Sequence, residues 1–190
     1  AQMAGTGTAI VSARMELAGL LSRLIVRDAD EASPFPDALI ALTGALDELA
    51  RDMAASEIEA QYGERLRAGR RADAAAGRTL DGPHRSDLAV SHRPKAMPAE
   101  HCSTGEQKAL LVGILLAHAR LVSELAGFAP ILLLDEIAAH LDSRRRAALF
   151  DRIEALGCQA WMTGTDRALF EAMAERAQYF TVSAGALART

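Results

Sequence analysis

The stretch ILLLDE at residues 131–136 is the part of the sequence that decides the fold. Four consecutive apolar residues follow Pro130, and Asp135 and Glu136 come directly after them. A short, wholly apolar run of this kind is typical of a strand that is buried on both faces in a parallel sheet. Because parallel sheets place their ligands at the carboxyl ends of their strands, the two acids indicate a functional site. The alternative is a pair of solvated acids in an ordinary turn.

Helix and strand patterns alternate around this stretch. The expected elements are helices at 104–125, 143–156 and 167–176, and strands at 158–163 and 178–183. Gly157 ends the second of these helices, as glycine commonly does. The order strand, helix, strand, helix, strand implies a parallel sheet with helices on its faces. Trp161 and the apolar residues Leu110, Leu111, Ile114 and Leu115 are expected in the core, and His118 is expected to be packed.

The first 77 residues have a different character, because helix formers dominate them. The expected elements are an apolar-faced helix at 10–26, a loop at 28–37, a short strand or helix at 39–49, and a polar helix from Asp47 or Asp52 to Ala76. We therefore expect a helical arm at residues 1–77 and an α/β lobe at residues 78–190.

Composition limits the class of protein. The chain has 190 residues, of which 50% are hydrophobic and 24% charged, and its formal net charge is −4. This balance is that of an ordinary soluble globular protein. We find neither the roughly 20 uninterrupted apolar residues of a membrane helix nor a secretion signal, so we expect a cytoplasmic protein without a membrane span. Cys102 and Cys158 are too few for a metal knuckle and are interpreted as reduced thiols.

A second informative stretch, CSTGEQK at residues 102–108, stands directly before the helix expected at 104–125. Ser103 and Glu106 have the spacing of a capping box, in which each side chain satisfies a backbone N–H group of the helix start. Gly105 is not explained by a cap, because glycine lowers helix propensity by about 1 kcal/mol. A glycine there would let a phosphate approach the free N–H groups of the helix. Both interpretations stay open at this point.

Three stretches in this order resemble motifs of the ABC-type ATPases. Residues 103–107 resemble the signature motif, 131–136 the Walker B strand, and AAHLD at 138–142 the D-loop. With GPHRSDL at 82–88 and QAWMTGTD at 159–166, the chain is similar to the C-terminal half of the RecF family, bacterial recombination-repair ATPases related to Rad50 and SMC proteins.

The resemblance implies the C-terminal lobe of an ABC-type P-loop ATPase, in which two heads clamp ATP between them. Glu136 and Asp135 would be catalytic: Glu136 would position the hydrolytic water and Asp135 would hold Mg²⁺. Asp142 would cross the dimer interface. The residues that the resemblance assigns to ATP contact are Ser103, Thr104, Gly105, Glu106, Gln107, Asp142 and Thr165.

The sequence departs from the ABC pattern at two points. The usual switch histidine is missing, and residues 163–166 read TGTD instead, so Thr165 or Asp166 is the candidate γ-phosphate sensor. No phosphate loop of the form GxxxxGK[ST] is present, and the two lysines, Lys95 and Lys108, lie elsewhere. We therefore expect a C-terminal piece of a longer protein, which by itself neither binds nor hydrolyses ATP.

Partners follow from the resemblance alone. They are double-stranded and gapped DNA, a second RecF-like head, and the mediators RecR and RecO, in DNA replication, recombination and the SOS response. The rival interpretations are an SMC- or RecN-like head and an interaction module without ATPase activity.

Two sets of basic residues have open roles. The run Arg144–Arg146 would contact DNA or the opposite head, or form a solvated helix face. His84 and Arg85 would contact DNA or shape the turn before a strand.

Overall fold

The computed structural model describes residues 2–30 and 32–189. The chain forms two compact units. The first comprises residues up to Ala29 together with Asp37–Cys102, and the second comprises Asp30–Pro36 and the residues from Ser103 onward. The division expected after Gly77 therefore lies inside the first unit, because residues 87–92, beyond Gly77, pair with residues 38–43, before it.

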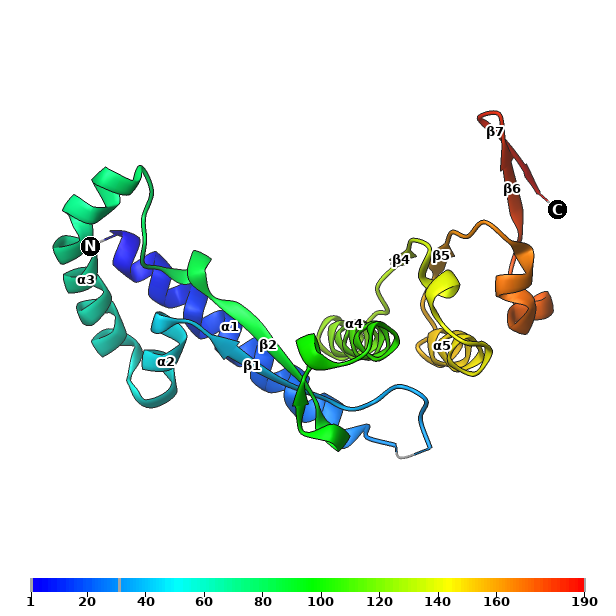
Figure 1. Cartoon of the computed structure of the whole chain (residues 1–190), viewed down its shortest axis with the longest axis horizontal. Coiled ribbons are helices and arrows are strands. Elements are labelled where there is room, and N and C mark those ends of the chain that lie inside the picture. The colour runs from blue at the N-terminus through cyan, green and yellow to red at the C-terminus, as the bar shows by residue number, and fades with distance from the viewer. Residues whose placement is uncertain (1, 31, 190) are drawn as a thin grey trace. The chain divides into compact units, whose positions relative to one another are not determined.

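The first unit combines three helices with a small antiparallel sheet (Figure 1). Its elements are α1 (Gln2–Arg27), β1 (Ala38–Thr43), α2 (Ala45–Asp52), α3 (Ala55–Ala76), β2 (Asp87–His92) and β3 (Met97–Pro98), with short 3-10 turns at Pro83–Arg85, Arg93–Lys95 and Ala99–His101. β2 pairs with both β1 and β3, and Ile40 lies opposite Val90. β1 and the first part of α2 occupy residues 39–49, for which a strand or a helix was left open. The polar helix expected from Asp47 or Asp52 to Ala76 is interrupted between α2 and α3.

The second unit contains α4 (Thr104–Ala126), β4 (Leu132–Leu134), α5 (Ser143–Ala155), β5 (Ala160–Met162), a 3-10 segment at Arg167–Arg176, β6 (Phe180–Ser183) and β7 (Ala186–Arg189). β4 and β5 are parallel, which confirms the expected parallel pairing. β6 instead pairs with β7 in a separate antiparallel hairpin, so the expected third parallel strand is wrong. The turn at Ala184 and Gly185 has positive φ at both residues and returns the chain at once.

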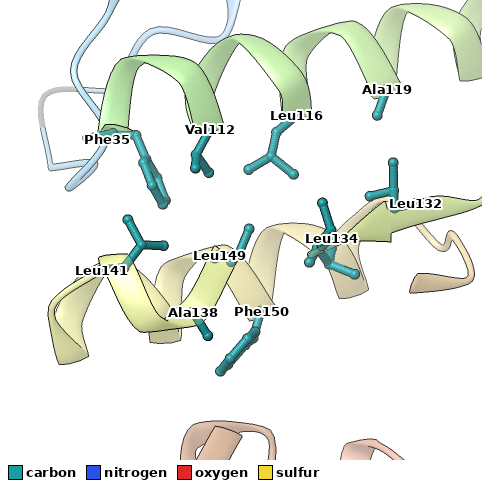
Figure 2. Close-up of a cluster of buried hydrophobic side chains, with 12 residues drawn as sticks. Phe35, Val112, Leu116, Ala119, Leu132, Leu134, Ala138, Leu141, Leu149 and Phe150 are labelled. Atoms are coloured by element: carbon teal, nitrogen blue, oxygen red, sulfur yellow. The ribbon is translucent and has the colours of Figure 1, made fainter. Parts of the chain in front are cut away.

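The core of the second unit lies between α4, β4 and α5 (Figure 2). α4 contributes Val112, Leu116 and Ala119, which point toward β4 and α5. Phe150 of α5 is fully buried, and Phe35 enters this core from the 30–36 segment. The apolar face expected for α4 is partly wrong, because Leu111 is 66% exposed. His118, which was expected to be packed, is also exposed.

Among the described residues, α4 is the one helix that is long and apolar enough to cross a membrane by length and composition. Its residues Ala109, Val112, Leu116 and Ala119 belong to the core of the second unit, and Val112 and Leu116 are each 4% exposed. A core helix of a globular protein passes the same test of length and composition. The position of α4 therefore indicates a core helix rather than a membrane span.

The sheet formed by β4 and β5 is covered on one face only. Leu132 and Leu134 are buried, as expected of a core strand. Leu133 is 77% exposed, and Trp161, its partner in the register, is 55% exposed. The expectations of a strand buried on both faces and of a core tryptophan are therefore wrong for the described chain.

Candidate functional site

The acid pair lies where the two parallel strands end. Asp135 follows β4, and Thr163 follows β5. The Thr163 hydroxyl donates to Asp135 Oδ1 at 2.5 Å, and the backbone N–H of Glu136 donates to Thr163 Oγ1 at 3.0 Å. Thr163 also donates its own N–H to the carbonyl of Leu134 at 3.1 Å. Thr163, directly after β5, thus holds both acids at the carboxyl edge of the sheet.

Glu136 adopts a backbone conformation that few side chains tolerate. Its φ and ψ are 52° and 17°, in the left-handed region, and it precedes the 3-10 turn Ile137–His140. For a residue other than glycine this conformation costs about 1–2 kcal/mol. Such strain persists only where the surroundings hold it, and it concentrates at functional sites. The hydrogen bond to Thr163 is one contact that holds it here.

The start of α4 is capped as the sequence predicted. Ser103 Oγ accepts from the N–H of Glu106 at 3.4 Å. The Glu106 carboxylate accepts from the Ser103 N–H at 3.0 Å and from its hydroxyl at 2.8 Å. The capping box is therefore confirmed. Helix geometry leaves the N–H groups of Thr104 and Gly105 without acceptors inside the helix, so the helix start keeps donors for an anion.

Asp142 caps α5, the helix that follows the D-loop-like stretch. Its carboxylate accepts from the N–H of Arg145 at 2.8 Å and pairs with the Arg145 guanidinium at 3.5 Å. A Cβ added to Gly105 would lie 3.8 Å from Nη1 of the same guanidinium. Arg145 therefore brings the start of α4 and the start of α5 together, which the sequence did not indicate.

The arginine run of α5 holds neighbouring loops. Arg145 Nε donates to the carbonyl of Pro34 at 3.1 Å, and Arg144 donates to the carbonyl of Ala32, also at 3.1 Å. Arg146 donates to the carbonyl of Leu141 at 2.6 Å. These contacts favour a structural role for the run over the solvated face considered from the sequence.

The contacts form two clusters, one around Thr163 and one around Arg145. Sequence reasoning gave Thr163 no role and considered Arg145 only as part of the Arg144–Arg146 run. A polar residue at the end of the strand beside β4 is a usable signal for Thr163. Thr165 is exposed. Asp166 caps the following 3-10 segment and accepts from the N–H of Ala168 at 2.9 Å. Gln107 is partly buried in the first turns of α4.

The acid pair offers oxygen ligands that suit a hard cation. The hydroxyl of Thr163 engages Oδ1 of Asp135, which leaves Oδ2 for a cation or its water. Mg²⁺ prefers such oxygen ligands and usually keeps several waters. Within residues 2–30 and 32–189, no three or more histidine, cysteine or acidic side chains are grouped closely enough to hold a metal ion. Burial raises the pKa of the Cys158 thiol, which makes it a poor nucleophile or ligand.

Comparison with known proteins places this geometry in a family. No protein-family model matches the chain. The chain is 62% identical over 189 residues to the DNA replication and repair protein RecF of Rhizobium rhizogenes, and 61% identical over 186 residues to that of Brucella abortus. These matches cover 100% and 98% of the chain, but 50% and 48% of the two relatives. The chain thus spans about half the length of the curated relatives that it matches.

The fold agrees with this comparison. A solved structure described as the recombination mediator protein RecF-ATPrS in the RecFOR pathway matches 98% of the chain with a TM-score of 0.76. The two sequences are 21% identical, and the match covers 48% of that structure's chain. The mixed helices and parallel strands are accordingly those of an ABC-type P-loop ATPase lobe. From the sequence identity over its whole length, the chain belongs to the RecF family, of which it represents a C-terminal half.

Proposed function

We propose that the chain supplies the signature motif, Walker B strand and D-loop of a RecF-like DNA-binding ATPase in recombinational DNA repair and replication. The arrangement of Asp135, Glu136 and Thr163 at the carboxyl edge of two parallel strands carries this proposal. A pure scaffold has no need of two acids, one of them strained, at this edge. The identity to RecF proteins does not favour the SMC- or RecN-like alternative.

In this proposal the acid pair serves phosphoryl transfer from ATP to water. The Glu136 carboxylate would accept a hydrogen bond from the attacking water and orient it, while the Asp135 carboxylate would hold Mg²⁺. When bound, Mg²⁺ would neutralise charge on the phosphate oxygens. Thr163 keeps the Asp135 carboxylate and the Glu136 backbone in place, so the two acids are already positioned before the substrate binds.

The start of α4 would meet the γ-phosphate of an ATP held by a second head. The N–H groups of Thr104 and Gly105 and the hydroxyl of Ser103 supply donors, and the positive end of the helix dipole adds to them. Glu106 acts through Ser103, whose cap it completes. Further contacts proposed for the same nucleotide are those of Gln107, Asp142 and Thr165.

The partners that we propose are double-stranded and gapped DNA, a second RecF-like head, and the mediators RecR and RecO, in the cytoplasm. The solved relative's own description places it with ATPrS in the RecFOR pathway. The sequence has no phosphate loop of the Walker A form. ATP binding and hydrolysis are therefore proposed for the full-length protein, with Walker A supplied outside the 190 residues.

The test is steady-state ATP turnover of the full-length gene product, with and without double-stranded DNA. We expect DNA-stimulated turnover in the wild-type protein and its loss in Glu136→Gln, which keeps the shape of the side chain and removes its charge. Wild-type turnover that the substitution leaves unchanged would remove the catalytic role of Glu136. Absence of turnover in the wild-type protein would favour the interaction module.

A further inference from the structure

The first unit contains a hollow of about 310 Å³ that the proposed ATPase function does not use. It lies at the loop between α3 and β2, and its lining residues come from both sides of the Gly82-Pro83 turn. The residues that line it are Arg78, Thr79, Leu80, His84 and Arg85. Two arginines, a histidine and a threonine are therefore among the five residues that line it, and none of the five is acidic.

The beginning of this loop is fixed by the end of α3. Gly77 ends the helix in the left-handed conformation, and the N–H of Arg78 donates to the carbonyl of Asp73 at 3.2 Å. The Asp73 carboxylate accepts from the N–H of Leu80 at 2.9 Å. The Asp73 side chain is thus engaged in holding the loop.

Asp81, the second acid of the region, is also engaged. Its carboxylate pairs with Arg65 at 3.4 Å, and its carbonyl accepts from the Tyr62 hydroxyl at 3.4 Å. Burial, together with the nearby carboxylates of Asp81 and Asp73, raises the pKa of Tyr62, so the phenol stays protonated and can donate. The middle of the loop is therefore held by α3.

The far end of the loop is held by α1 and by the loop itself. Arg14 of α1 donates to the carbonyl of Pro83. His84 Nε2 donates to the carbonyl of Thr79 at 2.9 Å, which joins the two sides of the hollow. The His84 ring therefore serves to brace the loop.

Arg78 and Arg85 are the cations that this bracing does not use. Neither guanidinium makes a hydrogen bond or an ion pair with any residue in the described ranges. Both nearby carboxylates, of Asp73 and Asp81, are engaged elsewhere. Both arginines line the hollow, so an anion held there would accept hydrogen bonds from cations that have no partner among the described residues.

We propose that this hollow binds a phosphate group, carried either by a nucleic-acid backbone or by a free phosphate-bearing small molecule. The planar guanidinium groups of Arg78 and Arg85 match phosphate oxygens in pairs. The Thr79 hydroxyl is a further hydrogen-bond donor among the residues that line the hollow. Because the loop is already braced, little ordering free energy is lost on binding. The site shares no residue with the acid pair or the start of α4.

The test uses the full-length gene product without nucleotide and the double variant R78A/R85A. One arm measures binding of a fluorescent 20-base-pair duplex by anisotropy at several salt concentrations, and the other measures binding of inorganic phosphate by calorimetry. The matched control is R70A/R71A, which removes the same charge from exposed positions of α3 that do not line the hollow. R78K/R85K keeps the charge and removes the paired hydrogen bonds.

If the phosphate belongs to a nucleic acid, R78A/R85A weakens duplex binding by about tenfold or more and lowers the salt slope by about 1–2, unlike the control. If it belongs to a small molecule, duplex binding is unchanged and the variant loses phosphate binding. In whichever of the two measurements R78A/R85A is affected, the affinity of R78K/R85K should lie between those of the wild-type protein and R78A/R85A.

The proposal is overturned if R78A/R85A matches R70A/R71A in both arms. It is also overturned if R78A/R85A loses affinity only for an acidic peptide such as polyglutamate, since the site would then recognise carboxylates. Duplex and phosphate binding should persist in Glu136→Gln. Failure of the ATPase assignment can therefore be told apart from failure of this one.

Discussion

The Thr163 hydroxyl shows how one small side chain can organise two acids. It donates to Asp135 and accepts from the backbone of Glu136. A hydrogen bond to a charged group contributes about 1.5–3 kcal/mol. If this contribution is expressed in the transition state, its loss slows the reaction by roughly tenfold or more.

We predict that Thr163→Val lowers the ATP turnover of the full-length protein by roughly tenfold or more and raises the Mg²⁺ concentration needed for half-maximal turnover. Valine keeps the shape of threonine and removes the hydroxyl, while Thr163→Ser restores it. Turnover is measured at a series of Mg²⁺ concentrations. A misplaced Asp135 raises the Mg²⁺ concentration needed for half-maximal turnover, whereas simple loss of folded protein lowers turnover at every Mg²⁺ concentration. Wild-type turnover and Mg²⁺ dependence in Thr163→Val would show that the hydroxyl has no such role.

At the scale of one element, α5 depends on its first residues for more than its own stability. Asp142 caps the helix and holds Arg145, and Arg145 contacts the carbonyl of Pro34 and lies close to Gly105. Removing an N-cap carboxylate typically costs about 1 kcal/mol. Here the loss would also free a guanidinium beside the start of α4.

We therefore predict that Asp142→Ala lowers the free energy of unfolding by about 1 kcal/mol, measured by urea denaturation of the full-length protein. Asp142→Asn is the matched control, because asparagine caps equally well and lacks the charge that pairs with Arg145. Asparagine should retain most of the stability. Equal destabilisation by both variants would mean that the ion pair, and not the cap, carries the effect.

The sequence was most informative where local signals agree. The spacing of apolar residues predicted α4 and α5, and the Ser103–Glu106 pattern predicted the cap, since each depends on neighbours within a turn of helix. The sheet of the first unit depends on pairing between β1 and β2, where Ile40 lies opposite Val90. No local pattern encodes such a pairing. The contact of Thr163 with Asp135 likewise joins residues from different strands.

At the scale of the whole molecule, one face of the β4–β5 sheet exposes large apolar side chains that a complete core would bury. Each strand has three residues, and strands this short need neighbours to be stable. Leu133 is 77% exposed and Trp161 55% exposed on the same face. The chain spans about half the length of the relatives that it matches. We therefore expect other parts of the full-length protein to cover this face.

We predict that Leu133→Lys destabilises the full-length protein by several kcal/mol or prevents its soluble expression, because a buried, unpaired ammonium is strongly unfavourable. Leu125→Lys at the end of α4 is the control, since Leu125 is 65% exposed and lies outside the sheet. Thermal unfolding of the two variants measures the difference. If both lysines are tolerated equally, the face formed by Leu133 and Trp161 stays open to water in the full-length protein, and the sheet must derive its stability from the α4–α5 side alone.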